Sequence, residues 1–372
     1  MKNHPGTDNR TQARTARRAL LASIAMGFAR YSMAAPPMPA ASVTGLSNPL
    51  RLPGTGPATT QLSIIGSTDL PVFAPVLRDY QRLHPGVAIR YEEFSTQDLY
   101  RQAAQAQAGG ADLLVSSSMD LQVQLVNDGR GQPYRSAETA ALPTWARWRD
   151  EIFGFSYEPM VIAYDTRRFT PATAPATRRR LLQLLRDPAR PFDKRVGGYD
   201  LAGSGIGYLA ATQDARFDEN AGALLAAMAD NHALQVMHAG VLLDAMERGE
   251  LDLAYNVPAS YVQGRIDAGK PVGMVLPNDY TLVIARTAVI PRSAVNVAEA
   301  RRFLDYLLSP RGQEVLAREA RILPIRADVA RQSHPVGALR PIPLGPGLLV
   351  YQDRLKRARF LDAWRAVTPA VR

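Results

Sequence analysis

The chain has 372 residues, which exceeds one ordinary domain and suits two, and its composition of 46% apolar and 21% charged residues excludes disorder along its whole length. The net charge is +10, but the basic residues are spread along the chain without a recognition motif, so we favour a basic solvated surface and predict no nucleic-acid binding. The absence of cysteine excludes disulfides, thiolate metal sites and a cysteine nucleophile.

The first residues are typical of an export signal. Four arginines within residues 10–18 precede the apolar run 19–29, which is too short to span a bilayer, and Ser32-Met33-Ala34 offers small residues for cleavage. We predict a cleaved signal peptide over residues 1–34, a periplasmic protein, and a flexible leader over residues 35–60, which are rich in Pro, Gly, Ser and Thr. An uncleaved anchor is the alternative.

Strand-like apolar runs then alternate with amphipathic runs. The expected strands are Leu62–Gly66, Val87–Glu92, Asp112–Val115, Phe153–Tyr157, Val161–Tyr164, Arg195–Tyr199, Leu251–Asn256, Val272–Leu276 and Leu282–Ile290. The expected helices are Val72–His84, Gln97–Ala108, Leu121–Asn127, Thr177–Arg186, Ile206–Gln213, Gly222–Ala229, Leu234–Arg248, Val297–Ser309, Arg311–Arg318 and Tyr351–Val367. Pro75 favours a start of the first regular helix near Phe73. The alternation predicts an α/β fold with mostly parallel sheets flanked by helices.

Two segments are typical of chain crossings between lobes. Residues 153–159 end one apolar run and start the next, and Leu282–Ile290 has the composition of a return crossing. They predict a first lobe from residues 61–157 plus 284–372 and a second lobe from residues 158–283.

Small hydroxyl residues follow two of the expected strands in the first lobe. Ser67 and Thr68 come directly after Gly66, and Ser117 lies in the serine run after Asp112–Val115. Each residue alone is best explained as a helix cap. Together, at the carboxyl ends of parallel strands, they lie where open α/β sheets bind ligands.

The second lobe offers a similar set. Ser204 and Gly205 precede a helix, where free N–H groups favour an anion, although a purely structural loop is an equal alternative. Tyr255 and Asn256 end a strand and can donate hydrogen bonds. We expect Tyr261 to lie in packing or at a rim, and His238 at the surface.

Enzyme signatures are absent from the sequence. It contains no His-Glu-x-x-His, Gly-x-Ser-x-Gly or Ser-x-x-Lys motif, no dinucleotide fingerprint and no P-loop. The five histidines are scattered and give no usual metal pair. We therefore predict neither catalysis, nor a resident metal, nor a cofactor.

Five segments, in this order, carry a family resemblance: Gly66-Ser67-Thr68-Asp69, residues 80–86, 111–116, 248–256 and 303–313. With them the chain resembles the substrate-binding proteins of bacterial ATP-binding-cassette (ABC) importers, in the branch of ferric-iron, phosphonate and phosphoglycerate-type binders. The resemblance implies a two-lobed fold of the type II periplasmic binding proteins, which closes on its ligand by hinge motion and delivers it to a membrane permease.

The resemblance also tests iron as a ligand. Ferric binders have a histidine near the position of Thr68, a glutamate near Ser117, and two adjacent tyrosines where this chain has Pro258-Ala259. Neutral hydroxyls are poor ligands for a hard cation, so direct iron coordination is disfavoured, and it stays as an alternative.

Hydroxyls and backbone N–H groups at helix starts suit a phosphonate, phosphate ester or carboxylate instead. We therefore expect a monomer that binds a small organic anion through residues of both lobes: Ser67, Thr68, Ser117, Ser204, Gly205, Tyr255 and Asn256. A ligand-sensing partner of a membrane sensor kinase is an alternative to transport, and an enzyme on this fold is a third.

Overall fold

The computed structural model describes residues 49–55, 60–105, 110–329 and 338–368. The predicted signal peptide lies outside these ranges. Within the predicted leader, Leu50–Leu52 forms a strand, β1, which pairs antiparallel with β3 (Val87–Glu93). For these three residues the prediction of a flexible leader is wrong, because Leu50 and Leu52 pack against the hydrophobic core.

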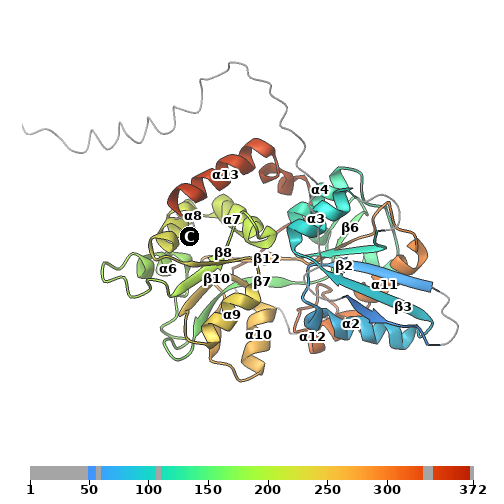
Figure 1. Ribbon diagram of the computed structural model, residues 1–372, viewed down its shortest axis with the longest axis horizontal. Coiled ribbons are helices and arrows are strands. Elements are labelled where there is room, and N and C mark those ends of the chain that lie inside the picture. The colour runs from blue at the N-terminus through green and yellow to red at the C-terminus, as the bar shows by residue number, and fades with distance from the viewer. Residues whose placement is uncertain (1–48, 56–59, 106–109, 330–337, 369–372) are drawn as a thin grey trace, which may run out of the picture. The chain divides into compact units, whose positions relative to one another are not determined.

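The first of two sheets contains the parallel strands β3, β2 and β4, and antiparallel strands extend it on both sides. The order of its strands is β1, β3, β2 (Thr60–Gly66), β4 (Leu113–Ser116), β13 (Thr287–Val289), β6 (Ile152–Gly154) and β5 (Arg147–Trp148). The helices that pack on it or on one another are α2 (Leu70–Leu83), α3 (Thr96–Gln105), α4 (Met119–Asn127), α11 (Val297–Leu308) and α12 (Pro310–Glu319). We call this sheet with these helices the first half (Figure 1).

The second sheet contains the parallel strands β10, β8 and β9. The order is β14 (Leu339–Pro341), β12 (Thr281–Ile284), β7 (Glu158–Asp165), β10 (Leu253–Pro258), β8 (Val196–Tyr199) and β9 (Leu234–Val236), with β11 (Val272–Val275) also paired to β7. Its helices are α6 (Arg178–Leu185), α7 (Gly205–Phe217), α8 (Ala221–Asp230), α9 (Ala239–Glu247) and α10 (Ala259–Asp267). This sheet and its helices form the second half.

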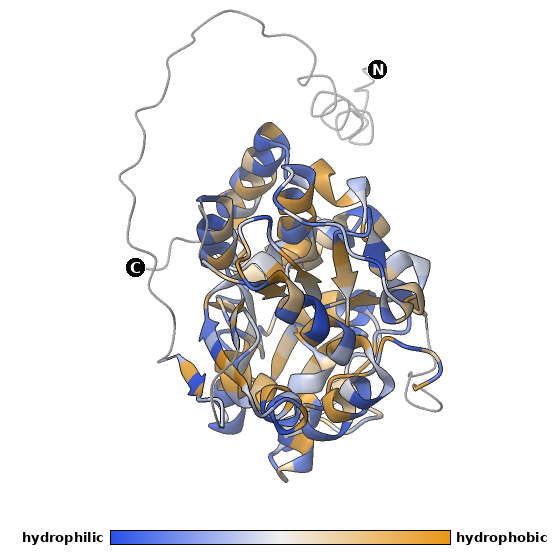
Figure 2. Ribbon diagram, turned by 90° about the vertical axis from the view of Figure 1, so that its right-hand side faces the viewer, coloured by the Kyte–Doolittle hydropathy of each residue, from blue (hydrophilic) through white to orange (hydrophobic). Residues whose placement is uncertain are grey.

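The predicted α/β fold is confirmed. Apolar residues of both sheets and of the inner helix faces form the core, and in Figure 2 the helices alternate between hydrophobic and hydrophilic colouring, as amphipathic helices do. Among the described residues, none of the helices combines the length and apolar character that a membrane crossing requires.

The chain passes between the sheets along two adjacent segments. It leaves β6 at Gly154 and enters β7 at Glu158, and it returns from β12 to β13 through Ala285 and Arg286. The two segments are hydrogen-bonded, because the Phe155 amide donates to the Arg286 carbonyl at 2.8 Å and the Arg286 amide donates to Ser156 Oγ at 2.8 Å. The expected single strand Leu282–Ile290 is therefore two strands that belong to different sheets.

The lobe boundaries given above stay a prediction. The C-terminal region contacts both halves: β14 pairs with β12, the turn η2 (Pro346–Tyr351) packs against α4, and α13 (Arg354–Val367) packs against α8.

Two other expectations are wrong. The run Leu234–Arg248 is not one helix, since β9 first pairs with β8 and α9 begins only at Ala239. Helix α2 begins at Leu70 and not near Phe73, so Pro75 lies inside it. The Leu70 amide donates to Glu93 Oε2 at 2.8 Å, and this hydrogen bond fixes the earlier first turn.

A buried carboxylate joins α2 to α11 and α12. Asp79 on α2 accepts two hydrogen bonds from the Arg311 guanidinium, both at 2.9 Å, and one from the Tyr306 hydroxyl at 2.8 Å. The Arg311 guanidinium, with Arg82 and Tyr306, holds the pKa of Asp79 well below its ordinary value of 3.8, although burial acts in the opposite direction.

We expect Asp79→Asn to lower the free energy of unfolding by about 2 kcal/mol at pH 7, because the buried donors lose a charged acceptor. A depressed pKa means that this stabilisation is present above the pKa of the unfolded chain, near 3.8, and is lost as the pH falls below it. Urea unfolding at pH 7 and at pH 3 measures both effects, and the difference between the two proteins is expected to shrink at pH 3.

The control is Asp362→Asn, which breaks the exposed pair with Arg365 on α13 and is expected to change stability by less than about 1 kcal/mol. Equal losses in the two variants would contradict the role assigned to Asp79.

Candidate functional site

A cleft of about 490 Å³, partly open to solvent, lies between the two halves. Its lining comes from the carboxyl ends of six strands. Ser67 and Asp69 follow β2, residues 94–96 follow β3, Ser117 follows β4, Tyr199 ends β8, Met237 and His238 follow β9, Pro258 ends β10 and Tyr261 follows it. Open α/β sheets bind ligands at this edge, where loops and helix starts leave polar groups free.

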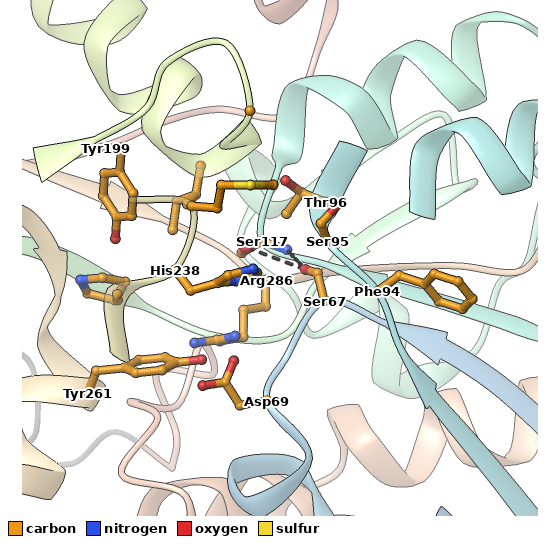
Figure 3. Close-up of a pocket in the computed structure, with 15 residues that line it drawn as sticks. Ser67, Asp69, Phe94, Ser95, Thr96, Ser117, Tyr199, His238, Tyr261 and Arg286 are labelled. Carbon is orange, nitrogen blue, oxygen red and sulfur yellow. Dashed lines mark hydrogen bonds between the residues drawn. The ribbon is translucent and has the colours of Figure 1, made fainter. Parts of the chain in front are cut away.

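Ser67 and Ser117 form one wall of the cleft. The Ser117 amide donates to Ser67 Oγ at 3.1 Å, and the two hydroxyl oxygens lie 3.5 Å apart. Gly66 makes room for the Tyr91 hydroxyl, which donates to the Thr68 carbonyl, because a Cβ at position 66 would lie 2.3 Å from that hydroxyl. The strand end is thereby fixed with both serine hydroxyls beside the cleft (Figure 3).

Arg286, from the return crossing, lines the cleft and is only 2% exposed. Its Nη1 donates to Thr68 Oγ1 at 2.9 Å and its Nη2 donates to Glu158 Oε2 at 3.1 Å. Its Nε has no hydrogen-bond partner among the described residues. Burial acts to lower the pKa of Arg286, but Glu158, Tyr261 and Asp69 outweigh it and raise the pKa, so the guanidinium is charged.

Asp69 and Tyr261 lie beside this guanidinium. Figure 3 shows the Asp69 carboxylate, the Tyr261 hydroxyl and the Arg286 guanidinium turned toward one another, and the Tyr261 ring centroid is 5.5 Å from Arg286 Cζ. Burial raises the pKa of Tyr261, Arg286 opposes the rise and Asp69 adds to it, so the phenol keeps its proton.

Tyr199 brings a second buried phenol to the cleft. Burial raises its pKa, and its hydroxyl has no hydrogen-bond partner among the described residues. The cleft therefore offers a guanidinium, serine and tyrosine hydroxyls, and the Asp69 carboxylate. Within the described ranges, no three His, Cys, Asp or Glu side chains are grouped so that they could hold a metal ion.

A family model, bacterial extracellular solute-binding protein, matches residues 64–319, which is more than half of the chain. The chain belongs to this family. Among solved structures, the substrate-binding protein of an ABC transporter from Agrobacterium tumefaciens is 30% identical, with a TM-score of 0.80, over 87% of this chain and 99% of that chain. No curated protein matches the sequence significantly. The predicted family, the substrate-binding components of ABC transporters, is confirmed.

Two more distant structures share the fold. Iron-bound HitA from Pseudomonas aeruginosa is 18% identical, with a TM-score of 0.64, over 83% of this chain and 99% of that chain. AfuA from Actinobacillus pleuropneumoniae, solved with fructose-6-phosphate bound, is 16% identical, with a TM-score of 0.70, over 84% of this chain and 100% of that chain. Proteins of this family bind a solute without transforming it, so this solute-binding protein is not an enzyme.

The predicted site residues lie in three different places in this solute-binding protein. Ser67 and Ser117 line the cleft, whereas Thr68 is fully buried behind it, with its hydroxyl accepting from Arg286. Thr68 therefore positions the guanidinium and does not face the cleft.

Ser204 and Gly205 lie where the two halves touch. Ser204 caps α7 by accepting from the Gly207 amide at 3.3 Å, and the Gly205 amide donates to Thr96 Oγ1 of the first half at 3.0 Å. A Cβ at Gly205 would lie 2.5 Å from that oxygen. The Ser204 hydroxyl oxygen and the Gly205 amide are therefore engaged within the protein, and their neighbours Gly203 and Ile206 line the cleft instead.

Tyr255 and Asn256 do not line the cleft and bind the buried Asp214. The Tyr255 hydroxyl accepts from Arg178 Nε at 2.6 Å and donates to Asp214 Oδ2 at 2.8 Å, and Asn256 Nδ2 donates to the same oxygen at 2.7 Å. The sequence could not reveal this pairing, because Asp214 and Arg178 lie on other helices.

Sequence analysis missed Asp69, Tyr199 and Arg286 as site residues and assigned Tyr261 and His238 to other roles. The clearest available signal was Arg286, the single charge within the apolar run Leu282–Ile290.

We expect Tyr199→Phe to change the free energy of unfolding of the ligand-free protein by less than about 0.5 kcal/mol, because its hydroxyl has no partner to lose. Tyr255→Phe is expected to lower it by about 2 kcal/mol, because Asp214 and Arg178 each lose a buried partner. The two tyrosines are matched in exposure, 7% and 6%, so denaturant unfolding compares their hydroxyls directly. A stable Tyr255→Phe protein with weakened solute binding would instead support Tyr255 as a ligand residue.

Proposed function

We propose that this protein captures a small organic anion that also carries hydroxyl or ammonium groups, and delivers it to an ABC permease in the inner membrane. The observation that carries the proposal is the buried Arg286 guanidinium, which lines the cleft and whose Nε–H lacks a partner within the described residues. A charged donor held in a low-dielectric cleft binds phosphonate, phosphate or carboxylate oxygens more strongly than a neutral donor does.

The neighbours of Arg286 support an oxyanion as the bound group. Ser67, Ser117 and Tyr199 can each donate a hydroxyl proton, and the wall between the two serines is fixed by their mutual hydrogen bond. Preorganised donors lose little entropy when a ligand binds, which favours affinity.

Asp69 restricts the solute further. A carboxylate at the cleft repels a plain anion, so the solute has to offer it a donor, either a hydroxyl or an ammonium group. Phosphorylated sugars and zwitterionic phosphonates or carboxylates have both kinds of group. The fold shared with AfuA, solved with fructose-6-phosphate, is consistent with this class.

The cellular setting remains part of the proposal. The predicted signal peptide and the extracellular solute-binding family support export to the periplasm, where we expect the protein to act as a monomer. If the neighbouring genes encode a sensor kinase and no permease, the same cleft would serve ligand sensing.

Ferric ion is the second candidate, because Asp69, Tyr261 and His238 all line the cleft and are able ligands. The fixed positive charge of Arg286 beside Tyr261 repels a trivalent cation. The organic anion is therefore the preferred solute.

A thermal-shift screen of the ligand-stripped protein tests the proposal with sugar phosphates, aminophosphonates, amino acids and ferric citrate. The melting temperature is expected to rise with members of the first three classes, because only the folded protein binds them. Calorimetry then measures the affinity. A melting temperature that rises with ferric citrate alone would contradict the organic anion and indicate iron as the solute.

The double variant Arg286→Gln with Glu158→Gln is expected to fold, because it removes both charges of a buried pair, and to bind the anion about 100-fold more weakly. The matched control, Arg365→Gln with Asp362→Asn, neutralises an exposed pair and is expected to keep the affinity. Unchanged binding in the folded Arg286 variant would exclude the guanidinium as the anion's partner.

A further inference from the structure

A second cavity, partly open to solvent, lies beside the cleft and shares Tyr199 with it. Its walls come from the ends of β8 and β10, from α8, and from the end of α13. Leu225, Met228, Ala229 and Trp364 make most of this surface apolar. None of the described residues that line it has a charged side chain, in contrast to the cleft with Arg286 and Asp69.

Three residues of this cavity's lining carry a polar atom that no described residue satisfies: Tyr199, Asn256 and Thr368. Asn256 is 4% exposed, and its side-chain orientation is fixed because Nδ2 donates to Asp214 Oδ2 at 2.7 Å. Its Oδ1 and the Thr368 Oγ1 at the end of α13 are buried without a hydrogen-bond partner among the described residues. Buried acceptors are rarely left unpaired, so a molecule in the cavity has to supply their donors.

The polarity of the walls favours an organic molecule over water. Water needs two to four polar partners at each position, and the wall formed by Leu225, Met228, Ala229 and Trp364 does not offer them. The indole of Trp364 and the thioether of Met228 suit contact with a ring. A neutral molecule is favoured because a charged one would be buried without a counter-charge.

We propose that this cavity is a second binding site, for a compact uncharged ring compound with a hydroxyl or N–H group that donates to Asn256 Oδ1. The inference is independent of the solute proposed for the cleft. Because Tyr199 lies in both walls, an occupant of the second cavity contacts a residue of the first, and binding at the two sites is expected to be coupled reciprocally.

Phenol and indole are the probes. Titration of the intact protein is expected to show saturable binding of one molecule with quenching of Trp364 fluorescence, and a crystal soaked with phenol is expected to show its hydroxyl at Asn256. In Trp364→Phe the quenching is expected to disappear while calorimetry still detects binding. Ser67→Trp, which obstructs the cleft, is expected to keep one saturable phenol site, with an affinity changed only by the coupling through Tyr199.

Ala233→Phe places a ring at a half-buried position of the second cavity and is expected to weaken phenol binding at least about tenfold. Its control is Ala363→Phe on the exposed face of α13, which is expected to bind like the unmodified protein. Circular dichroism confirms that both variants are folded. The proposal is overturned by absence of saturable binding of both probes, by equal binding in the folded Ala233→Phe protein, by loss of binding in Ser67→Trp, or by crystals that show only water in the cavity.

Discussion

The contact on which the rest of the structure depends is the buried guanidinium of Arg286 between Thr68 and Glu158. Thr68 belongs to the loop after β2, and Glu158 begins β7, so one side chain joins the first half to the second at the crossing. A buried ion pair of this kind adds little net stability, since desolvation offsets the attraction. Its value lies in position: the protein holds two of its nitrogens, no described residue bonds the third, and the side chain lines the cleft.

The architecture explains why one arginine can serve both halves. Both sets of parallel strands direct their carboxyl ends to the same cleft, and the return crossing runs beside them. At the edge of the cleft, the close approach of Gly205 to Thr96 lets the halves touch. A solute bound by Arg286 and Ser67 on one side and Tyr199 on the other would therefore be held by both halves, which is the condition for closure coupled to binding.

The features that could be predicted from the sequence are those that depend on the pattern of residues within a short segment. Alternating apolar runs identify the α/β fold, and a serine after a buried strand is enough to locate Ser67 and Ser117. Prediction from the sequence fails where a partner far along the chain decides the role of a side chain. Tyr255 ends an expected strand, as a ligand residue would, yet Asp214 and Arg178 form hydrogen bonds with its hydroxyl. Arg286 was missed for a different reason: the run Leu282–Ile290 was predicted as a return crossing, but its single charged residue was not assigned to the site, although the chain passes from one sheet to the other there.

The end of β10 shows how one strand can serve two cavities. Its pairing with β7 shifts between Ala254 and Val257, so two residues of β10 oppose one of β7, and Asn256 adopts a φ of 57° within this bulge. Within the bulge, Tyr255 and Asn256 turn to Asp214 and the second cavity. After it, Pro258 and α10 lead to the cleft, where Tyr261 meets Arg286. A regular strand would turn successive side chains to alternate faces. The bulge therefore separates the residues that face the second cavity from those that lead to the cleft.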